Sequence, residues 1–175
     1  MSVSSHLSPE PERRLWVIHE NVRRSVEWTD TKLGILAVLA VLEIPVIFGG
    51  FRPGLLTYAG ALLMCLALPL VLAGLSPFVD APGPVSLLDQ PVGKMLPDDS
   101  FLLARDLARY PHAELVFRLE KYLGGGITSL RYHEDIVARI IAVSRACVRK
   151  ERLFSAACVA ALAAQLALIA ALLLR

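Results

Sequence analysis

Two polar side chains interrupt long apolar runs, and they are the first candidates for chemistry in this sequence. Glu43 lies ten positions into the run that begins at Leu33, and Gln165 lies at a similar depth in the run from Leu153 to Leu174. An ionisable side chain inside a membrane span is costly and usually faces the protein interior or a water-filled path. We therefore predict a hydrogen bond between Glu43 and Gln165, which acts either as a packing contact between helices or as part of a gate.

A second candidate for chemistry is the run Tyr132-His133-Glu134-Asp135, because histidine and carboxylates are common metal ligands. Adjacent positions on a helix point in different directions, however, and the sequence has no second histidine and carboxylate pair at a suitable spacing. We predict a solvated helix face or a helix start, and no metal site. His19 and His112 are isolated, so we predict no metal site at either of them.

Catalytic chemistry finds no support in the sequence. There is no Gly-x-Ser-x-Gly, no glycine-rich phosphate loop with a lysine, and no cysteine and histidine constellation. We therefore expect no catalytic residue, no cofactor and no enzymatic activity. The net charge of +2 gives no reason to expect a nucleic-acid partner.

A basic cluster could bind an anionic lipid or a phosphate. Its members lie shortly before the last apolar run, within a predicted helix. They are Arg139, Arg145, Arg149, Lys150 and Arg152. The alternative is a solvated helix face beside the membrane, which needs no ligand and also orients the last span.

The elements that must position these residues are mostly apolar helices, since 55% of the chain is hydrophobic. A span needs about 20 apolar residues. The runs Leu55 to Leu75 and Leu153 to Leu174 carry no charge, and Leu33 to Phe51 is a third, shorter run. A signal peptide is the alternative for the first run, but it begins only after 32 residues and lacks a cleavage site. We predict three membrane spans and the lipid bilayer as a partner.

Polar helices adjoin the spans. Residues 1–11 are expected to be a flexible tail, and residues 12–31 an amphipathic cytosolic helix. Its apolar stripe favours contact with a partner helix over the membrane surface. The stripe comprises Leu15, Ile18, Val22 and Val26. Residues 32–76 are expected to form a transmembrane hairpin with its turn at Gly49 to Gly54.

Residues 77–126 are expected to be a proline-rich cytosolic connector with short helices. Asp98-Asp99-Ser100 is typical of a helix start, and predicts a helix that ends near Arg109. A second helix is predicted from His112 to Leu123, and three glycines follow it. The stalk helix at 127–152 and the last span at 153–175 have no Pro or Gly after Ile127, so they can form one helix of about 45 residues.

Lysine and arginine counts predict the orientation. Residues 1–32 contain five and residues 76–152 contain eleven, whereas the hairpin turn has Arg52 alone and the tail has Arg175 alone. Basic segments stay in the cytoplasm. The sequence therefore predicts an all-α, multi-pass membrane protein with its N-terminus in the cytosol and its C-terminus outside; a bacterial inner membrane and a periplasmic C-terminus follow only from the family resemblance given below. The predicted protein has three transmembrane helices, amphipathic stalk helices and a small helical insert.

Two segments resemble one known family. The run Trp28-Thr29-Asp30-Thr31-Lys32-Leu33-Gly34-Ile35-Leu36 resembles the Ala-Asp-Ser/Thr-Lys-Ala-Gly-Ile-Leu run that begins the first span in the transmembrane effectors of Pycsar antiphage systems. The stalk from Ile136 to Arg152, with Ser144 and Lys150, is similar to the last stalk of that family. Thr29, Leu33 and Glu151 depart from the family patterns. The order of parts is also similar.

This resemblance implies a function. In such a family a cytosolic cyclic pyrimidine mononucleotide is sensed, and the spans then impair the inner membrane, with the chain expected to act as a homo-oligomer. The residues expected to bind the phosphate of a cyclic mononucleotide are Lys32, Arg145, Arg149, Lys150 and Arg152. Asp30 and Lys32 lie level with Arg149 to Arg152, so we expect them to pair across helices and to couple the cytosolic part to Glu43.

Two other functions stay open on the sequence alone. The chain can be an accessory or structural membrane subunit, which pairs with another protein through its stalk helices while its spans serve as anchors. A membrane enzyme is the third and weakest alternative, because no catalytic constellation supports it.

Overall fold

The structure, a computed structural model, describes residues 10–76, 96, 98–124 and 131–174. Helix accounts for 87% of these residues, and none of them lies in a strand. The chain divides into two units. Residues 1–27 and 80–148 form one, here called the polar unit, and residues 28–79 and 149–175 form the other, here called the span unit.

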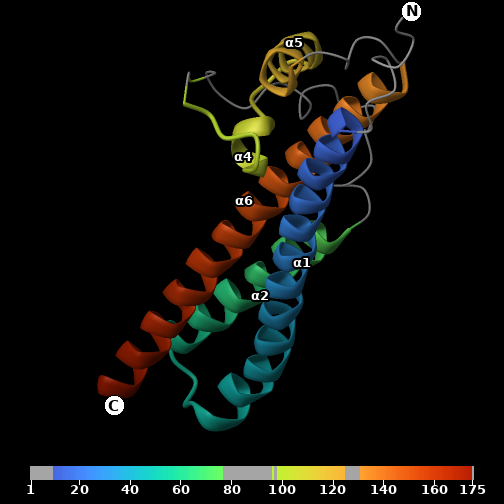
Figure 1. The fold of residues 1–175 in the computed structure, drawn as a ribbon. Helices are drawn as coiled ribbons and strands as arrows, with labels where there is room; N and C mark the ends of the chain where they lie inside the picture. Colours follow the sequence, from blue (N-terminus) through green and yellow to red (C-terminus); the bar gives the residue numbers. More distant parts are fainter. Residues whose placement is uncertain (1–9, 77–95, 97, 125–130, 175) are drawn as a thin grey trace, which may run out of the picture. The chain divides into compact units, whose positions relative to one another are not determined.

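Five helices are described, and two of them are long (Figure 1). They are α1 (Glu10–Gly50), α2 (Leu55–Leu75), α4 (Ala104–Leu107), α5 (His112–Leu123) and α6 (Arg131–Leu173). The 43 residues of α6 confirm that stalk and last span form one helix. Helix α1 likewise runs through 41 residues, because no breaker separates its polar part from its apolar part.

The ends of α1 differ from the sequence prediction. The helix begins at Glu10, within the segment expected to be a tail. It also includes Gly49 and Gly50, which were expected in the turn, so the turn itself is shorter and begins at Phe51. Glycine disfavours a helix by only about 1 kcal/mol, which the preceding turns of an already formed helix can offset.

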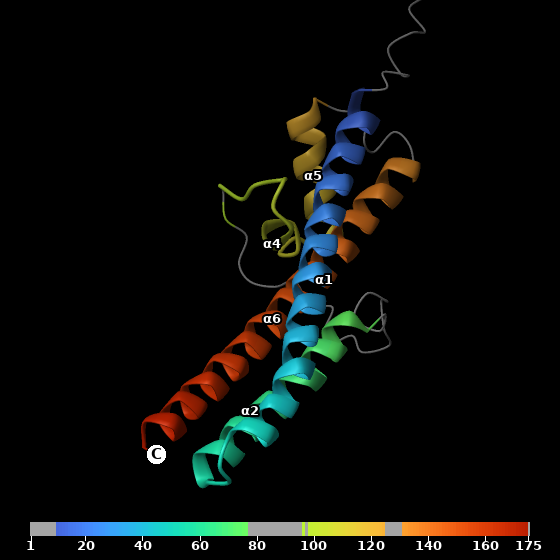
Figure 2. The same ribbon diagram turned by 90° about the horizontal axis from the view of Figure 1, so that it is seen from below.

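The core of the polar unit contains the predicted stripe of α1. Leu15, Ile18 and Val22 are buried and pack in one cluster with residues of α4, α5 and α6, and Val26 packs against it. Figures 1 and 2 both show α5 beside the first turns of α1. The predicted partner helix of this stripe is therefore supplied by the chain itself.

The predicted helix from Asp98 to Arg109 is wrong in its extent. Only Ala104–Leu107 is helical, and Leu103 precedes it without a side-chain cap. Asp99 does not cap a helix, because its carboxylate accepts hydrogen bonds from the Leu96 backbone N–H and from other side chains. These bonds hold the backbone at 98–103 in turns, so the helix begins later.

Helix α5 has the predicted bounds. It ends at Gly124, whose φ of 82° is in the left-handed region that glycine adopts without strain. The other two glycines of that run lie outside the described residues. Almost all of the proline-rich connector does so too, as do the first residues of the predicted stalk.

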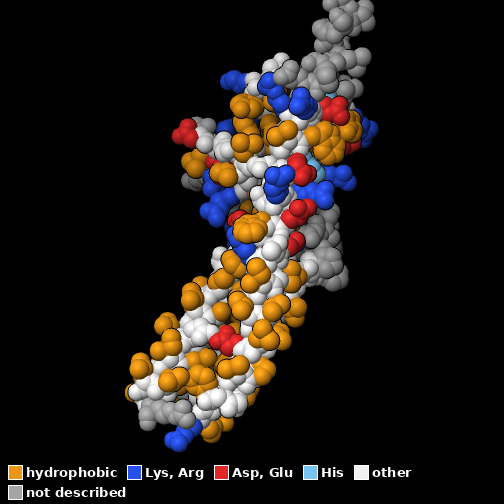
Figure 3. Space-filling model, turned by 60° about the horizontal axis from the view of Figure 1, so that its bottom comes forward, with side chains coloured by type: hydrophobic (Ala, Val, Ile, Leu, Met, Phe, Trp, Pro, Cys, Tyr) orange, Lys and Arg blue, Asp and Glu red, His pale blue; other side chains and the backbone are white. Residues whose placement is uncertain are grey.

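The span unit packs three helices that are each long and apolar enough to cross a membrane. Its two clusters of buried residues are centred on Ala40 and Ile47, and on Leu33 and Val71. Large apolar side chains remain exposed on these helices, and Figure 3 shows hydrophobic side chains covering them. Exposed apolar surface of this kind suits contact with lipid.

Two glycines of α2 allow its close approach to neighbouring helices. A Cβ at Gly60 would lie 2.9 Å from Leu168 Cγ and 3.3 Å from the Ala164 backbone oxygen. A Cβ at Gly74 would lie 2.9 Å from Leu33 Cδ1. Small residues at such contacts are typical of helix pairs in membranes, where backbone proximity provides the packing energy.

Candidate functional site

An ion pair joins α1 to α6 at the start of the span unit. The Lys150 ammonium donates to both carboxylate oxygens of Asp30, at 2.7 Å and 2.9 Å. The Lys150 side chain is 2% exposed and that of Asp30 is 37% exposed. The pairing of Asp30 with the basic stretch at 149–152 was predicted from their level along the two helices. A buried ammonium requires such a partner, because an unpaired charge would be strongly destabilising.

Lys32 lies in a different environment from Lys150. Its ammonium is 5.5 Å from the centroid of the Trp28 ring and 5.9 Å from that of the Phe154 ring. These distances fit cation–π contacts, which bring together one helix turn of α1 and a residue of α6. The pairing predicted for Asp30 is therefore observed with Lys150, whereas Lys32 contacts aromatic rings.

A second polar contact lies deeper in the span unit. The Gln165 side-chain amide donates a hydrogen bond to the Glu43 carboxylate, which confirms the predicted pair. Glu43 is thirteen residues beyond Asp30 on α1, or about 20 Å along the helix axis. A polar pair at this depth is more stable bonded than exposed to hydrocarbon. Its role as a packing contact or as a gate stays a prediction.

The phosphate-binding role of the five predicted basic residues also stays a prediction. Lys150 is paired with Asp30, and Lys32 contacts the two rings. Arg145, in the polar unit, donates from Nη2 to the Tyr110 backbone oxygen at 3.3 Å. Arg149 is half-buried and Arg152 is exposed. Lys150, Lys32 and Arg145 thus make contacts within the chain.

A buried carboxylate organises the turns of the polar unit. The Asp99 side chain is 3% exposed, and it accepts hydrogen bonds from the Tyr110 hydroxyl at 2.8 Å and Arg109 Nη1 at 2.9 Å. Burial raises the pKa of Asp99, but the bonds from the Leu96 N–H and Tyr110 and the Arg109 charge outweigh it. The pKa of Asp99 is therefore lower than usual.

Tyr110 extends this network to α5. Its hydroxyl accepts a hydrogen bond from Arg118 Nη1 at 2.8 Å, and the Arg118 guanidinium carbon lies 5.0 Å from the ring centroid. Burial, followed by the hydrogen bond to Asp99, raises the pKa of Tyr110. Sequence reasoning missed this network because it assigned Asp99 to a helix cap. The available signal was Tyr110 before Pro111, an aromatic with a polar end at a chain reversal.

The polar unit has a groove between α1 and α6. It has a volume of about 350 Å³. Its lining residues are Trp16, His19, Tyr132, Asp135, Ile136 and Arg139. Trp16 and His19 are in edge contact, with their ring centroids 5.3 Å apart. Burial, followed by the charge of Arg139, lowers the pKa of His19.

The run from Tyr132 to Asp135, which was considered as a metal site, lies at the start of α6 as described. Tyr132 and Asp135 are exposed, but His133 is buried, so the predicted solvated face is wrong for His133. Successive residues point in different directions, as expected on a helix. No three His, Cys, Asp or Glu side chains come together as a metal site within the described ranges.

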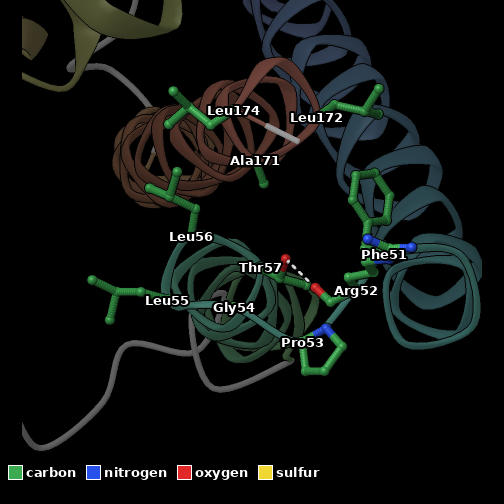
Figure 4. A pocket seen from close by; sticks show the side chains of 10 residues that line it. All are labelled: Phe51, Arg52, Pro53, Gly54, Leu55, Leu56, Thr57, Ala171, Leu172 and Leu174. Atoms are coloured by element: carbon green, nitrogen blue, oxygen red, sulfur yellow. Dashed lines mark hydrogen bonds between the residues drawn. The ribbon is translucent and has the colours of Figure 1, made fainter.

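A second cavity lies in the span unit, at the hairpin turn (Figure 4). It has a volume of about 510 Å³ and lies between the turn with the start of α2 and the end of α6. Thr57 Oγ1 donates to the Arg52 backbone oxygen at 3.0 Å and closes the turn. The other lining side chains are mostly apolar, so the cavity offers few polar groups to orient a ligand.

A family model described as the Pycsar effector protein domain matches residues 14–175. The chain belongs to this family. The match covers nearly all of α1 and extends to the end of α6, so it includes residues of both units. No curated protein and no solved structure matches the chain.

Membership of the Pycsar effector family supports a role as an effector of bacterial antiphage defence. It is also consistent with an effector that is not an enzyme. The three apolar helices indicate a multi-pass membrane protein.

Proposed function

We propose that this chain is an inner-membrane effector that responds to a cytosolic cyclic nucleotide and then impairs the membrane, through oligomerisation. The observation that carries the proposal is the match to the Pycsar effector domain over residues 14–175. The match includes the three helices able to span a membrane and the charged helices that precede them. Sensing and membrane action can therefore belong to one chain.

The hydrogen bond between Glu43 and Gln165 gives the spans a means of acting on the membrane. Polar side chains inside a membrane bond to one another across helices and favour helix association. In an oligomer, the same two groups can bond to other copies or face water. The apolar side chains exposed on the three span helices provide surface for association with other copies.

The stalk faces support the effector role over the accessory role. An accessory subunit would pair with its partner through the apolar stripes of α1 and α6. Those stripes are buried within one cluster of the polar unit, where Val22 and Ile140 are both 0% exposed. Pairing through these faces would require the cluster to open.

Coupling between the polar residues and the spans is proposed to act through the Asp30–Lys150 pair. Helices α1 and α6 each contribute residues to both units, so a shift of either helix moves both of its parts. In the proposal, Lys32 holds α1 against Phe154 while Asp30 binds Lys150. Asp30→Ala and Lys32→Ala are expected to insert normally and bind ligand, but to lose the membrane response.

The test is to express the chain in bacteria together with an inducible pyrimidine nucleotide cyclase, and to follow membrane potential with a voltage-sensitive dye. The wild-type chain is expected to depolarise cells only when the cyclase is induced. Glu43→Leu combined with Gln165→Leu should insert but not depolarise, because both polar groups are absent. Leu42→Val, a change at an exposed neighbour, is the control and should behave as the wild type.

Two outcomes would contradict the proposal. The first is a normally inserted wild-type chain that leaves the membrane potential unchanged with the cyclase induced. The second is purification of the chain in a stable complex with a different protein, without any toxicity of its own. That result would support the accessory role.

A further inference from the structure

The groove between α1 and α6 in the polar unit combines side chains that suit a small aromatic anion. Trp16 and Tyr132 are 41% and 49% exposed, and neither ring belongs to the hydrophobic core of the unit. Ile136 does belong to that core, so it provides a fixed apolar floor. Half-exposed aromatic rings beside a cavity are the usual surface on which nucleotide bases stack.

Two opposite charges line the same groove without neutralising each other. Asp135 and Arg139 lie one turn apart on α6, a spacing at which ion pairs commonly form. In the part of the chain that the structure describes, neither makes an ion pair or a hydrogen bond. The guanidinium is therefore free to bind a phosphate through two parallel hydrogen bonds, and the carboxylate is free to accept from a hydroxyl.

The size and charge of the groove limit the ligand. A volume of about 350 Å³ is near the lower end for small-molecule sites, which range from roughly 300 to 1,000 Å³. One arginine balances one negative charge, as on a cyclic phosphodiester. A triphosphate would bring several more charges, and Asp135 would repel them. His19 has a lowered pKa, so at neutral pH it contributes a hydrogen-bonding imidazole with little charge.

We propose that this groove is the site at which the chain binds a mononucleotide with a single phosphate charge. Arg139 binds the phosphate, Asp135 accepts from a ribose hydroxyl, and the base stacks on Trp16. The identity of the nucleotide, a 3′,5′-cyclic pyrimidine monophosphate, rests on the proposed function. Arg139 belongs to the basic cluster noted in the sequence, but the groove shares no residue with the set predicted to bind the phosphate of a cyclic mononucleotide, which comprises Lys32, Arg145, Arg149, Lys150 and Arg152.

The test is isothermal titration of cyclic uridine and cytidine monophosphates into the full-length chain in lipid nanodiscs. Arg139→Gln is expected to weaken binding at least about tenfold, since it removes a charge-assisted hydrogen-bonding group. Trp16→Leu should weaken it by about tenfold, through loss of stacking. Arg131→Gln is the matched control, because Arg131 is an exposed arginine of the same helix outside the groove. It should bind as the wild type does.

A second set of variants separates the groove from the predicted basic set. Arg149→Gln combined with Arg152→Gln should leave nucleotide binding unchanged. Uridine triphosphate should bind at least about tenfold more weakly than the cyclic monophosphate, because of the unbalanced charge. Circular dichroism of each variant checks that the helices are retained.

The possible negative results of these binding experiments contradict different claims. If the wild-type chain binds a cyclic nucleotide and Arg139→Gln binds it equally well, the groove is not the site, and the proposed function stands. Loss of binding in the Arg149 and Arg152 double variant alone would overturn the groove in favour of the basic set. If the wild-type chain binds neither cyclic nucleotide, both the groove and the nucleotide-responsive function are wrong.

Discussion

Asp30 and Lys150 show how a single buried charge constrains this chain. Lys150 is 2% exposed, and its ammonium donates two hydrogen bonds to the carboxylate of Asp30. Removing the carboxylate leaves an ammonium without its counter-charge in a nearly dry position. The Lys150 side chain can reach water only by displacing contacts between the helices.

Asp30→Asn is therefore expected to lower the free energy of unfolding by about 3 kcal/mol, the lower end for a broken buried pair, since Asp30 is partly exposed. Adding Lys150→Met should restore part of that loss. The measurement is thermal unfolding in detergent of both single variants and the double variant. Glu27→Gln is the control, because its pair with Arg23 is exposed and should contribute less than about 1 kcal/mol. Equal effects at Glu27 and Asp30 would contradict the account.

Asp99 gives the polar unit a predictable response to acid. Its pKa is lower in the folded chain than in the unfolded chain, so the unfolded chain binds the proton more tightly. Stability from Asp99 is present above the unfolded pKa of about 4, and is lost as the pH falls through the lower, folded pKa.

Asp99→Asn should lower the stability of the chain at pH 7 and flatten the dependence of stability on pH below about 4. Tyr110→Phe should move the acid transition to higher pH, because it removes a hydrogen bond that lowers the pKa.

That response is measured by chemical unfolding of the full chain at a series of pH values, followed by circular dichroism. An unchanged acid profile in both Asp99→Asn and Tyr110→Phe would show that another group controls it.

At this scale the sequence predicted contacts between helices better than contacts in turns. Two predicted contacts join residues of long helices: Asp30 with Lys150, and Glu43 with Gln165. The apolar pattern indicates where these helices begin, so the position of each residue along its helix could be compared with that of its partner. Asp99 lies in a turn, and its partners Arg109 and Tyr110 depend on a chain reversal that no periodic pattern encodes. The groove was missed for a different reason: it depends on which faces of α1 and α6 lie opposite each other, and the pattern of one helix does not encode that.

At the scale of elements, α2 depends on glycine for its packing. Three of the helical glycines, Gly60, Gly74 and Gly34, differ in the room available to a Cβ. At Gly60 the obstacles include the branch point of a leucine and a backbone oxygen, neither of which moves easily. At Gly74 the nearest atom is a terminal methyl of Leu33, which can rotate, and at Gly34 nothing lies within 4 Å.

The alanine variants should therefore rank in that order. Gly60→Ala is expected to lower the free energy of unfolding by about 1–3 kcal/mol through overpacking, and Gly74→Ala by less. Gly34→Ala should be neutral or stabilising by up to about 1 kcal/mol, because alanine favours the helix. Thermal unfolding in detergent ranks the three. A destabilisation at Gly34 as large as at Gly60 would contradict the packing of α2.

Helix α6 was predictable along its whole length because no residue in it opposes helix formation. The sequence of α6 has no Pro or Gly, and a continuous apolar pattern identifies its buried side. The four-residue α4 was predicted too long, because the carboxylate signal at Asp98-Asp99-Ser100 has two structural uses, a helix cap and a turn. Short elements depend on such local hydrogen bonds more than on periodicity.

At the scale of the whole molecule, the distribution of positive charge predicts the orientation in the membrane. The five lysines and arginines in residues 1–32 favour a cytoplasmic N-terminus, and Arg52 alone marks the hairpin turn. In a chain with its own cysteines replaced, Arg52→Cys should react with a membrane-impermeant thiol reagent added to spheroplasts. Arg13→Cys should react only after permeabilisation. The reverse pattern would contradict the orientation.

The central claim is that binding of a cyclic nucleotide causes this chain to damage the membrane without a second protein. The most direct measurement reconstitutes the purified chain into dye-filled liposomes and adds a cyclic pyrimidine monophosphate. The account predicts dye release with the nucleotide and little without it, together with loss of release in the Glu43→Leu and Gln165→Leu double variant. Absence of release from liposomes that contain correctly inserted chain, at saturating nucleotide, would contradict the account.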